Sequence, residues 1–251
     1  MSRDRRILAL LVGSIALIAF GWTSSSQGGN PPPEAPNPTP AVTPTAEPAT
    51  SGELAVDALD GLAIKGRAPK TGYSREQFGQ SWRDLDRNGC DQRNDVLRRD
   101  LADVVIKPNT RGCVVLAGIL TSPYSGESVR FSRGPQTSRE VPVDHVVALS
   151  DAWQKGAQQW TAAEREQFAN DLLELRATDV GTNSAKSDKD AASWLPPLKS
   201  SRCGFVAHQI AVKSKYALWV TQAEHDAMSR ILDRCPTQTL PTGAAVPLGS
   251  H

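Results

Sequence analysis

Histidine and cysteine are scarce in this chain of 251 residues, which contains only four of each. The sequence has no Cys-x-x-Cys pair, which argues against a structural zinc site. Histidine is the side chain that titrates nearest to neutral pH, so four histidines make a short list for acid–base chemistry. His208 and His225 fall in helical patterns and His251 stands at the end of the sequence. His145 is therefore the credible candidate for a general base.

The chain also lacks an excess of charge of either sign, with 28 Lys and Arg against 27 Asp and Glu. This balance excludes a strongly basic nucleic-acid coat protein and an acidic tail, but it does not exclude a local basic groove. We find no base-reading motif, no phosphate-cradling glycine loop and no nucleophile elbow. Internal repeats of 20–50 residues are absent too, and the length allows one domain or at most two.

Long apolar runs are limited to one, between residues 7 and 22, directly after Arg3, Arg5 and Arg6. Such a segment is typical of a signal peptide or a short membrane anchor, and we assign residues 1–22 to one of these. Residues 23–53 are rich in Pro, Thr and Ala and predict a disordered linker. We expect a protein that is secreted or anchored at the cell surface. Any membrane attachment would run through this N-terminal segment only.

An exported chain with an even number of cysteines is expected to form disulfides. Three pairings are possible, and we favour Cys90–Cys113 and Cys203–Cys235 because each closes a local unit. Each bridge would contribute about 3–4 kcal/mol through the entropy of the unfolded loop.

The remaining patterns predict one α+β domain over residues 54–235, followed by a flexible tail over 236–251. Two Thr-x-x-Glu capping boxes, at Thr161 and Thr221, each mark the start of a helix. Helices are predicted over 76–82, 95–105, 161–170, 183–190, 205–219 and 221–235, and strands over 113–120, 128–132, 141–149 and 172–177.

The pair Asp144-His145 suits metal-assisted hydrolysis. Asp144 can hold a cation while a neutral His145 deprotonates a water molecule. In the polar segment that follows, Asn183 can supply an oxygen ligand and Lys186, one helical turn later, can face a phosphate. Each pattern alone also fits a structural histidine or a solvated loop, but together they stand in the chain order strand, strand, helix.

Several motifs in the same order resemble the HNH, or ββα-metal, endonucleases over about residues 72–235. The sequence is most similar to secreted bacterial HNH proteins related to the C-terminal domain of modification-dependent restriction enzymes. The motifs are 82–97 (WRDLDRNGCDQRNDVL), 122–126 (SPYSG), 143–149 (VDHVVAL), 152–153 (AW), 168–171 (FAND), 182–188 (TNSAKSD) and 194–197 (WLPP).

The resemblance implies a ββα-metal (HNH, or His-Me finger) core with flanking helices and a short antiparallel sheet. It implies that His145 is the general base and that Asp144 and Asn183 bind one divalent metal, Mg²⁺ or alternatively Mn²⁺. It also raises a phosphate-binding role for Arg93, whose other interpretation is a surface ion pair. We expect an endonuclease that cleaves DNA rather than RNA with little sequence preference. The alternatives are a non-catalytic, disulfide-stabilised surface module and a hydrolase of another phosphodiester.

One position departs from the family pattern. Family members usually carry an asparagine before the hydrophobic pair of the second strand, where it helps to orient the catalytic loop, and Glu174 stands there. Either Glu174 substitutes for it, or Asn170 takes the orienting role, or activity is weakened.

The segment from Asp84 to Asp95 overlays the calcium-binding EF-hand loop, with Asp86 and Asn88 at ligand positions. Asp95 replaces the usual bidentate glutamate, and Asp91 occupies a position that is usually apolar. We therefore favour a simple Asp/Asn/Gly turn between two helices over a Ca²⁺ site.

Overall fold

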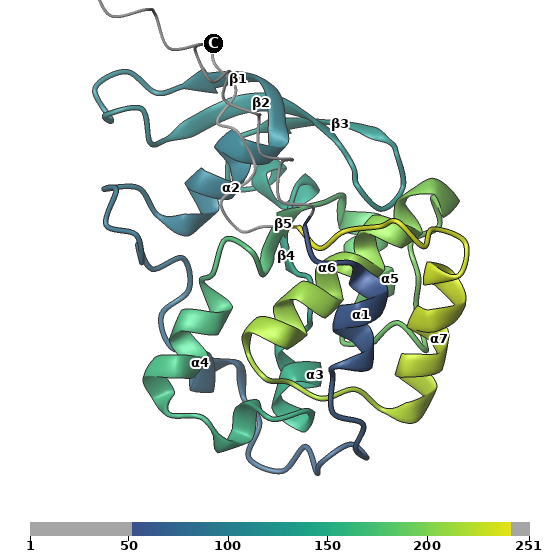
Figure 1. The fold of residues 1–251 in the computed structure, drawn as a ribbon. Helices are drawn as coiled ribbons and strands as arrows, with labels where there is room; N and C mark the ends of the chain where they lie inside the picture. The colour runs from purple at the N-terminus through teal and green to yellow at the C-terminus, as the bar shows by residue number, and fades with distance from the viewer. Residues whose placement is uncertain (1–51, 242–251) are drawn as a thin grey trace, which may run out of the picture. The chain divides into compact units, whose positions relative to one another are not determined.

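The computed structural model describes residues 52–241, all within one compact unit of the chain. The predicted signal or anchor and most of the linker lie outside these residues. Three antiparallel strands in the order β1-β2-β3 form the larger sheet: β1 (Leu101–Ile106), β2 (Val115–Thr121) and β3 (Ser128–Ser132). Helix α2 (Gln92–Asp100) leads directly into β1, and both lie at the top of Figure 1. Val96 and Leu97 of α2 pack with Leu120 and Phe131 of the sheet.

The predicted helix over 95–105 is wrong in its second half, because residues 101–106 form β1. This stretch contains Val104, Val105 and Ile106, which favour a strand, and its backbone pairs with β2. The helix instead begins earlier, at Gln92, where the side chain of Asp91 accepts the N–H of Asn94.

The second sheet has only two antiparallel strands, β4 (Val143–His145) and β5 (Leu175–Ala177), with Asp144 opposite Arg176. Helix α5 (Val180–Lys186) follows β5 after two residues. Helices α3 (Leu149–Gln154) and α4 (Ala162–Ala169) connect the two strands. Both strands are shorter than predicted. α5 begins and ends earlier than predicted, because Asp179 caps it by accepting the N–H of Thr182.

Helices α1 (Ala55–Asp60), α6 (Arg202–Lys215) and α7 (Gln222–Leu232) pack around a separate core and occupy the lower right of Figure 1. Short 3₁₀ turns complete the structure: η1 (Arg75–Phe78), η2 (Thr137–Glu140), η3 (Ala157–Gln159) and η4 (Lys199–Ser201). η1 is all that forms of the predicted helix 76–82. Part of the predicted tail is ordered here, since Gln238 and Leu240 form backbone hydrogen bonds with residues 53–55.

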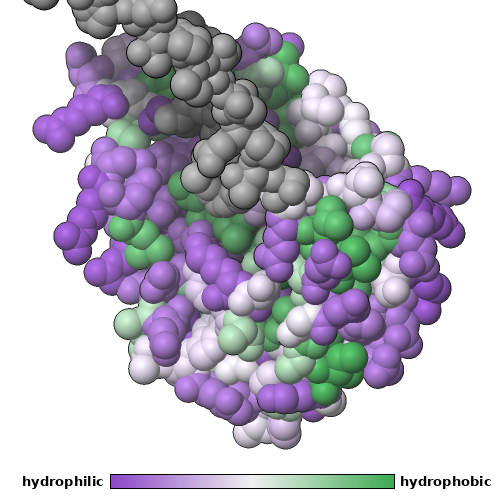
Figure 2. Space-filling view, viewed as in Figure 1, coloured by the Kyte–Doolittle hydropathy of each residue, from purple (hydrophilic) through white to green (hydrophobic). Residues whose placement is uncertain are grey.

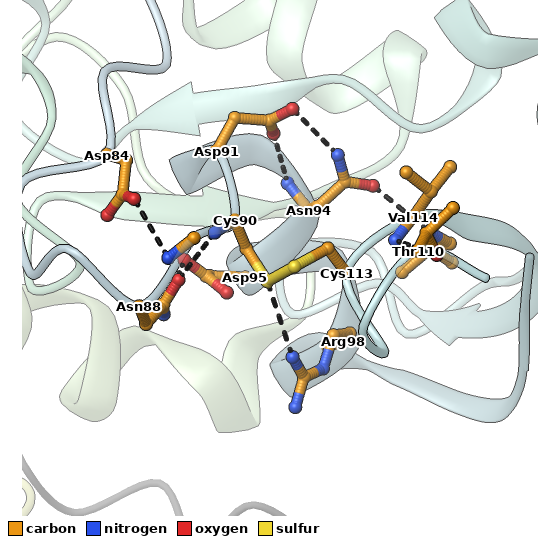
Figure 3. The surroundings of a disulfide bond; sticks show 12 residues. Asp84, Asn88, Cys90, Asp91, Asn94, Asp95, Arg98, Thr110, Cys113 and Val114 are labelled. Carbon is orange, nitrogen blue, oxygen red and sulfur yellow. Dashed lines mark hydrogen bonds between the residues drawn. A yellow bond between two sulfur atoms is a disulfide. The ribbon is translucent and has the colours of Figure 1, made fainter. Parts of the chain in front are cut away.

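Both predicted disulfides are confirmed. Cys90–Cys113 ties the start of α2 to the turn before β2, as Figure 3 shows. Cys203–Cys235 ties the first turn of α6 to the residues just after α7, so it closes the α6–α7 hairpin.

Six charged side chains, five of them buried, form a charge-balanced cluster. Lys155 is fully buried and contacts Asp151 at 2.7 Å, Asp190 at 2.9 Å and Glu224 at 2.5 Å. Lys213, also fully buried, contacts Glu224 at 3.0 Å and Asp151 at 3.3 Å. Arg67 completes the cluster from its edge through Asp151 and Asp190. Three cations thus balance three carboxylates, and the cluster joins the 66–68 segment, α3, the chain after α5, α6 and α7.

The cluster explains one difference from the sequence predictions. The Thr221 side chain accepts the N–H of Glu224 as predicted, but the carboxylate of Glu224 points to the two buried ammonium groups and not back to Thr221. The capping box at Thr161 is complete, because Glu164 there is exposed and has no such competitor.

The face of the molecule shown in Figure 2 mixes hydrophilic and apolar residues. Among residues 52–241, none of the helices combines the length and the apolar character needed to cross a membrane.

We predict that Lys155→Met destabilises the fold by about 3–5 kcal/mol, because it leaves buried carboxylates without their counter-charge. Lys215→Met is the matched control, since Lys215 pairs with Asp171 at the surface and should cost no more than about 1 kcal/mol. Urea denaturation of both variants measures the difference. Equal small losses would show that the cluster does not stabilise the fold.

Candidate functional site

A polar cavity of 300 Å³ lies between β4, α5 and η1. The predicted site residues Asp144, His145 and Asn183 all line it. They come together because β5 pairs with β4 and the two-residue connection after β5 turns α5 back against β4. The remaining lining residues are Tyr73, Arg75, Val143, Ala148, Leu149, Ser150, Ser187 and Asp188.

His145 is held as a neutral base. Its Nε2 lies 3.0 Å from the carbonyl oxygen of Ala169, which can only accept, so Nε2 carries the hydrogen and Nδ1 does not. Burial lowers the pKa of His145 to about 3, and the positive charges of Arg75 and Lys186 add to the effect. Nδ1 of a neutral imidazole is therefore available to accept a proton.

Asp144 is fixed through both of its carboxylate oxygens. Oδ1 accepts a hydrogen bond from Nζ of Lys186 at 3.0 Å, and Oδ2 accepts one from the hydroxyl of Tyr124 at 2.9 Å. Burial raises the pKa of the Asp144 carboxyl, whereas these two donors act in the opposite direction. The role of Tyr124 was not predicted from the sequence, where residues 122–126 entered only as one of the motifs that carry the family resemblance.

Lys186 does not face a phosphate as predicted. Its ammonium group is fully buried and donates to Asp144 Oδ1 and, at 2.7 Å, to the carbonyl oxygen of His145. Its position in the last turn of α5 directs it against β4. The structure therefore gives Lys186 a positioning role, which is to hold the Asp144-His145 backbone and carboxylate in place.

Arg93 is also used differently from the prediction. Its guanidinium donates to the backbone carbonyls of Ser138 and Val141 at 3.0 and 3.1 Å and lies over the ring of Trp82. These contacts tie α2 to the segment that leads into β4. Arg93 does not line the cavity, and its contacts among the described residues are structural rather than a surface ion pair. A phosphate contact of Arg93 stays a prediction.

Asn183 projects from the middle of α5, half-buried, and its side chain makes no hydrogen bond with the other described residues. Its amide oxygen is thus available as a ligand. The carboxylate of Asp144 has further acceptor capacity, because two oxygens offer about four sites and only two are used. One carboxylate and one amide oxygen suit Mg²⁺, which keeps several waters and binds substrate phosphates as further ligands. This donor set fits the predicted metal.

Two observations limit the affinity of such a site. Lys186 places a positive charge beside Asp144 and so opposes cation binding. Within residues 52–241, no group of three or more His, Cys, Asp or Glu side chains is arranged to hold a metal ion. Asp144 and Asn183 alone would therefore bind Mg²⁺ weakly until an anionic substrate adds its own oxygens.

The two candidate orienting residues serve different loops. Oε2 of the fully buried Glu174 accepts the N–H of Val147 at 3.1 Å, which braces the turn just after His145. Burial raises the pKa of Glu174 well above its ordinary value and so favours the protonated form of the carboxyl. Asn170 instead binds the backbone of Gln80 and Arg83. Of the two, Glu174 occupies the loop-bracing position next to the site.

Residues 84–95 form the Asp/Asn/Gly turn that the sequence favoured over a Ca²⁺ site. The side-chain amide nitrogen of Asn88 donates to Asp86 and Asp95 at 3.0 and 3.1 Å, and the backbone N–H of Gly89 donates to Asp84. The side-chain oxygen of Asn88 accepts the N–H of Cys90. The acidic groups are thus engaged by donors from the same segment, which joins η1 to α2.

Two comparisons find proteins that this chain is similar to. Residues 91–231 match the family described as "GmrSD restriction endonucleases, C-terminal domain". The chain is also 38% identical over 199 residues to an "Uncharacterized secreted protein" of Arthroderma benhamiae, with 78% of this chain and 92% of the relative covered. No solved structure matches.

We predict that burial of His145 contributes a loss of stability to the metal-free protein as the pH falls below about 6.5, the ordinary pKa of histidine in an unfolded chain. The raised pKa values of Glu174 and Asp144 act in the opposite direction, so the contribution of His145 is measured as a difference between wild type and variant. The folded pKa of His145 is about 3, so between these values the unfolded state binds more protons than the folded state. His208, whose pKa is lowered by burial to about 4, acts in the same direction.

Removing His145 should therefore weaken the dependence. In His145→Gln, the fall in unfolding free energy between pH 6 and pH 4 should be smaller by about 1.4 kcal/mol per pH unit. Urea denaturation at several pH values in EDTA measures both slopes. Identical slopes in wild type and variant would mean that His145 is not held neutral by burial.

Glu174 offers a second test. Glu174→Gln keeps an oxygen for the N–H of Val147 and should change stability by less than about 1 kcal/mol, because Gln mimics a protonated carboxyl. Glu174→Ala leaves that N–H unpaired beside a cavity and should cost about 2–4 kcal/mol. Urea denaturation of both variants distinguishes a protonated from an ionised Glu174. A Gln variant as unstable as the Ala variant would indicate an ionised Glu174.

Proposed function

The chain belongs to the family of the C-terminal domain of GmrSD restriction endonucleases, and from this premise we propose that it is an exported, metal-dependent endonuclease acting on DNA. The observation that carries the proposal is the meeting of a neutral His145, Asp144 and Asn183 in one polar cavity. The order β4, β5, α5 around this cavity supports assignment as a ββα-metal core.

In this proposal His145 activates the attacking water. Nδ1 takes one proton from the water, whose oxygen forms a bond to phosphorus while the bond to the 3′-oxygen breaks. The departing 3′-oxygen takes a proton from solvent. Ala169 accepts the Nε2–H throughout and stabilises the positive charge that the ring acquires.

The low pKa of His145 in the free protein must rise for this base to be effective, because a base works best when its pKa is near the working pH. A phosphate anion in the cavity favours the charged form of the ring and shifts the pKa in that direction. Mg²⁺ held by Asp144 and Asn183 would stabilise negative charge on the phosphate and on the leaving oxygen.

Export is supported by three observations. The basic and apolar N-terminal segment has the pattern of a signal peptide or anchor. The relative from Arthroderma benhamiae is described as secreted. The two disulfides suit an oxidising compartment. The family description supports DNA as the substrate class, and the near-neutral net charge supports little sequence preference only weakly.

Incubation of the purified chain with supercoiled plasmid tests the proposal. We expect nicking with Mg²⁺ or Mn²⁺ that EDTA abolishes. His145→Ala should lower the rate by about 10²–10⁴-fold, because it removes the general base. His225→Ala, on α7 and outside the cavity, should retain the wild-type rate.

Correct folding of each variant is checked by its melting temperature and its disulfides. A folded wild-type chain that nicks DNA with neither metal would contradict the proposal and favour the non-catalytic module. Equal rates for wild type and His145→Ala would also contradict it.

A further inference from the structure

The side chain of Arg75 is the one cationic group among the described residues that line the cavity. It also lines a small adjoining recess, again together with His145 and Leu149. Arg75 stands before residues 91–231, so it lies outside the part of the chain that matches the family. We propose that Arg75 binds the phosphate of the nucleic acid at the site, an inference that rests on the proposed nuclease function.

The backbone under Arg75 is firmly held. Phe78, at the end of η1, is buried against Phe168 and Trp153, with ring centroids 6.1 and 6.4 Å away. Gly79 follows with a φ of 71°, and a Cβ there would fall 2.7 Å from the side chain of Glu166. Glu166 in turn accepts the N–H of Gln80 at 2.9 Å. η1 is thereby fastened to α4, and a guanidinium mounted on it has a defined place at the cavity.

Among the described residues, the guanidinium group of Arg75 has no bonding partner. Within residues 52–241 it forms neither an ion pair nor a hydrogen bond, and the residue is exposed. The neighbouring cations are already used: Lys186 by Asp144 and His145, and Lys70 by Asp188 at 3.0 Å. Arg75 is therefore the cation that is free to meet an anion entering the cavity.

The chemistry of the group matches a phosphate. Guanidinium presents parallel N–H donors that can bind two phosphate oxygens at once, and it stays charged at every relevant pH. The other polar groups of the cavity are Asp144, Asp188, Asn183, Ser150, Ser187 and Tyr73, and none of these adds a second cation. Without Arg75, the described residues of the cavity would present no unpaired positive charge to a phosphodiester, because Lys186 and Lys70 are each paired with a carboxylate, Asp144 and Asp188.

Cleavage kinetics on the full chain give the first test. Arg75→Ala should lower kcat/KM for plasmid nicking by about 10–100-fold, and Arg75→Lys should recover only part of the loss because it restores charge without the fork. Arg130→Ala is the matched control, since it removes one exposed arginine from β3, outside the cavity, and should stay within about twofold of wild type.

Binding gives a second test that does not need turnover. A fluorescent DNA oligonucleotide is titrated into His145→Ala protein, with and without Arg75→Ala, at several salt concentrations. Loss of one phosphate contact should reduce the slope of log K against log[salt] by about 0.7–0.9, and Arg130→Ala should leave it unchanged.

The outcomes separate the two claims. If wild type does not nick DNA but Arg75→Ala still weakens binding and lowers the salt slope, the nuclease function fails and the phosphate contact stands. If wild type nicks DNA but Arg75→Ala cleaves and binds like Arg130→Ala, the phosphate contact is overturned and the nuclease function stands. Absence of any DNA binding overturns the contact as well.

Discussion

The buried ammonium group of Lys186 is the interaction on which the candidate site depends. It donates to the carboxylate of Asp144 and to the carbonyl oxygen of His145, so one side chain of α5 fixes two adjacent residues of β4. Asn183 lies about one helical turn before Lys186, and it lines the same cavity as Asp144. A buried charge of this kind is costly unless it is paired and hydrogen-bonded. Asp144 supplies the counter-charge of Lys186, and the hydroxyl of Tyr124 donates to the other oxygen of that carboxylate. The same ion pair limits how strongly Asp144 can bind a metal before substrate arrives.

The larger ion cluster around Lys155 fixes chain segments that flank the Lys186–Asp144 pair. Asp190, only four residues beyond Lys186, belongs to that cluster, so α5 is fixed at its end and again just after it. Asp151 and Lys155 anchor α3 in the same way from the other side of the cavity. The burial of His145 in this surround keeps its ring desolvated and lowers its pKa. The same buried charges thus stabilise the fold and fix the residues of the proposed site.

Local signals in the sequence were sufficient for several features. Loop closure identified both disulfides and the Thr161 capping box identified α4. The strand predicted over 128–132 is β3. The family resemblance brought together Asp144, His145 and Asn183.

The features that could not be predicted depend on partners that are distant in the chain. Lys186 and Arg93 turn inward to buried oxygens, and Glu224 leaves its cap for two ammonium groups. Residues 101–106 become a strand only because β2 pairs with them. Arg75 and Tyr124 were missed because nothing in their local sequence indicates the cavity.

The central claim is that Asp144 and Asn183 form a divalent-metal site beside a neutral His145. Anomalous diffraction from crystals of the protein soaked in Mn²⁺ with a short DNA oligonucleotide tests it most directly. The account predicts one strong manganese peak in the cavity, in contact with an oxygen of Asp144, an oxygen of Asn183 and a phosphate, and no such peak in Asn183→Ala crystals. A cavity without manganese, or a peak found only at the 84–95 turn, would contradict it.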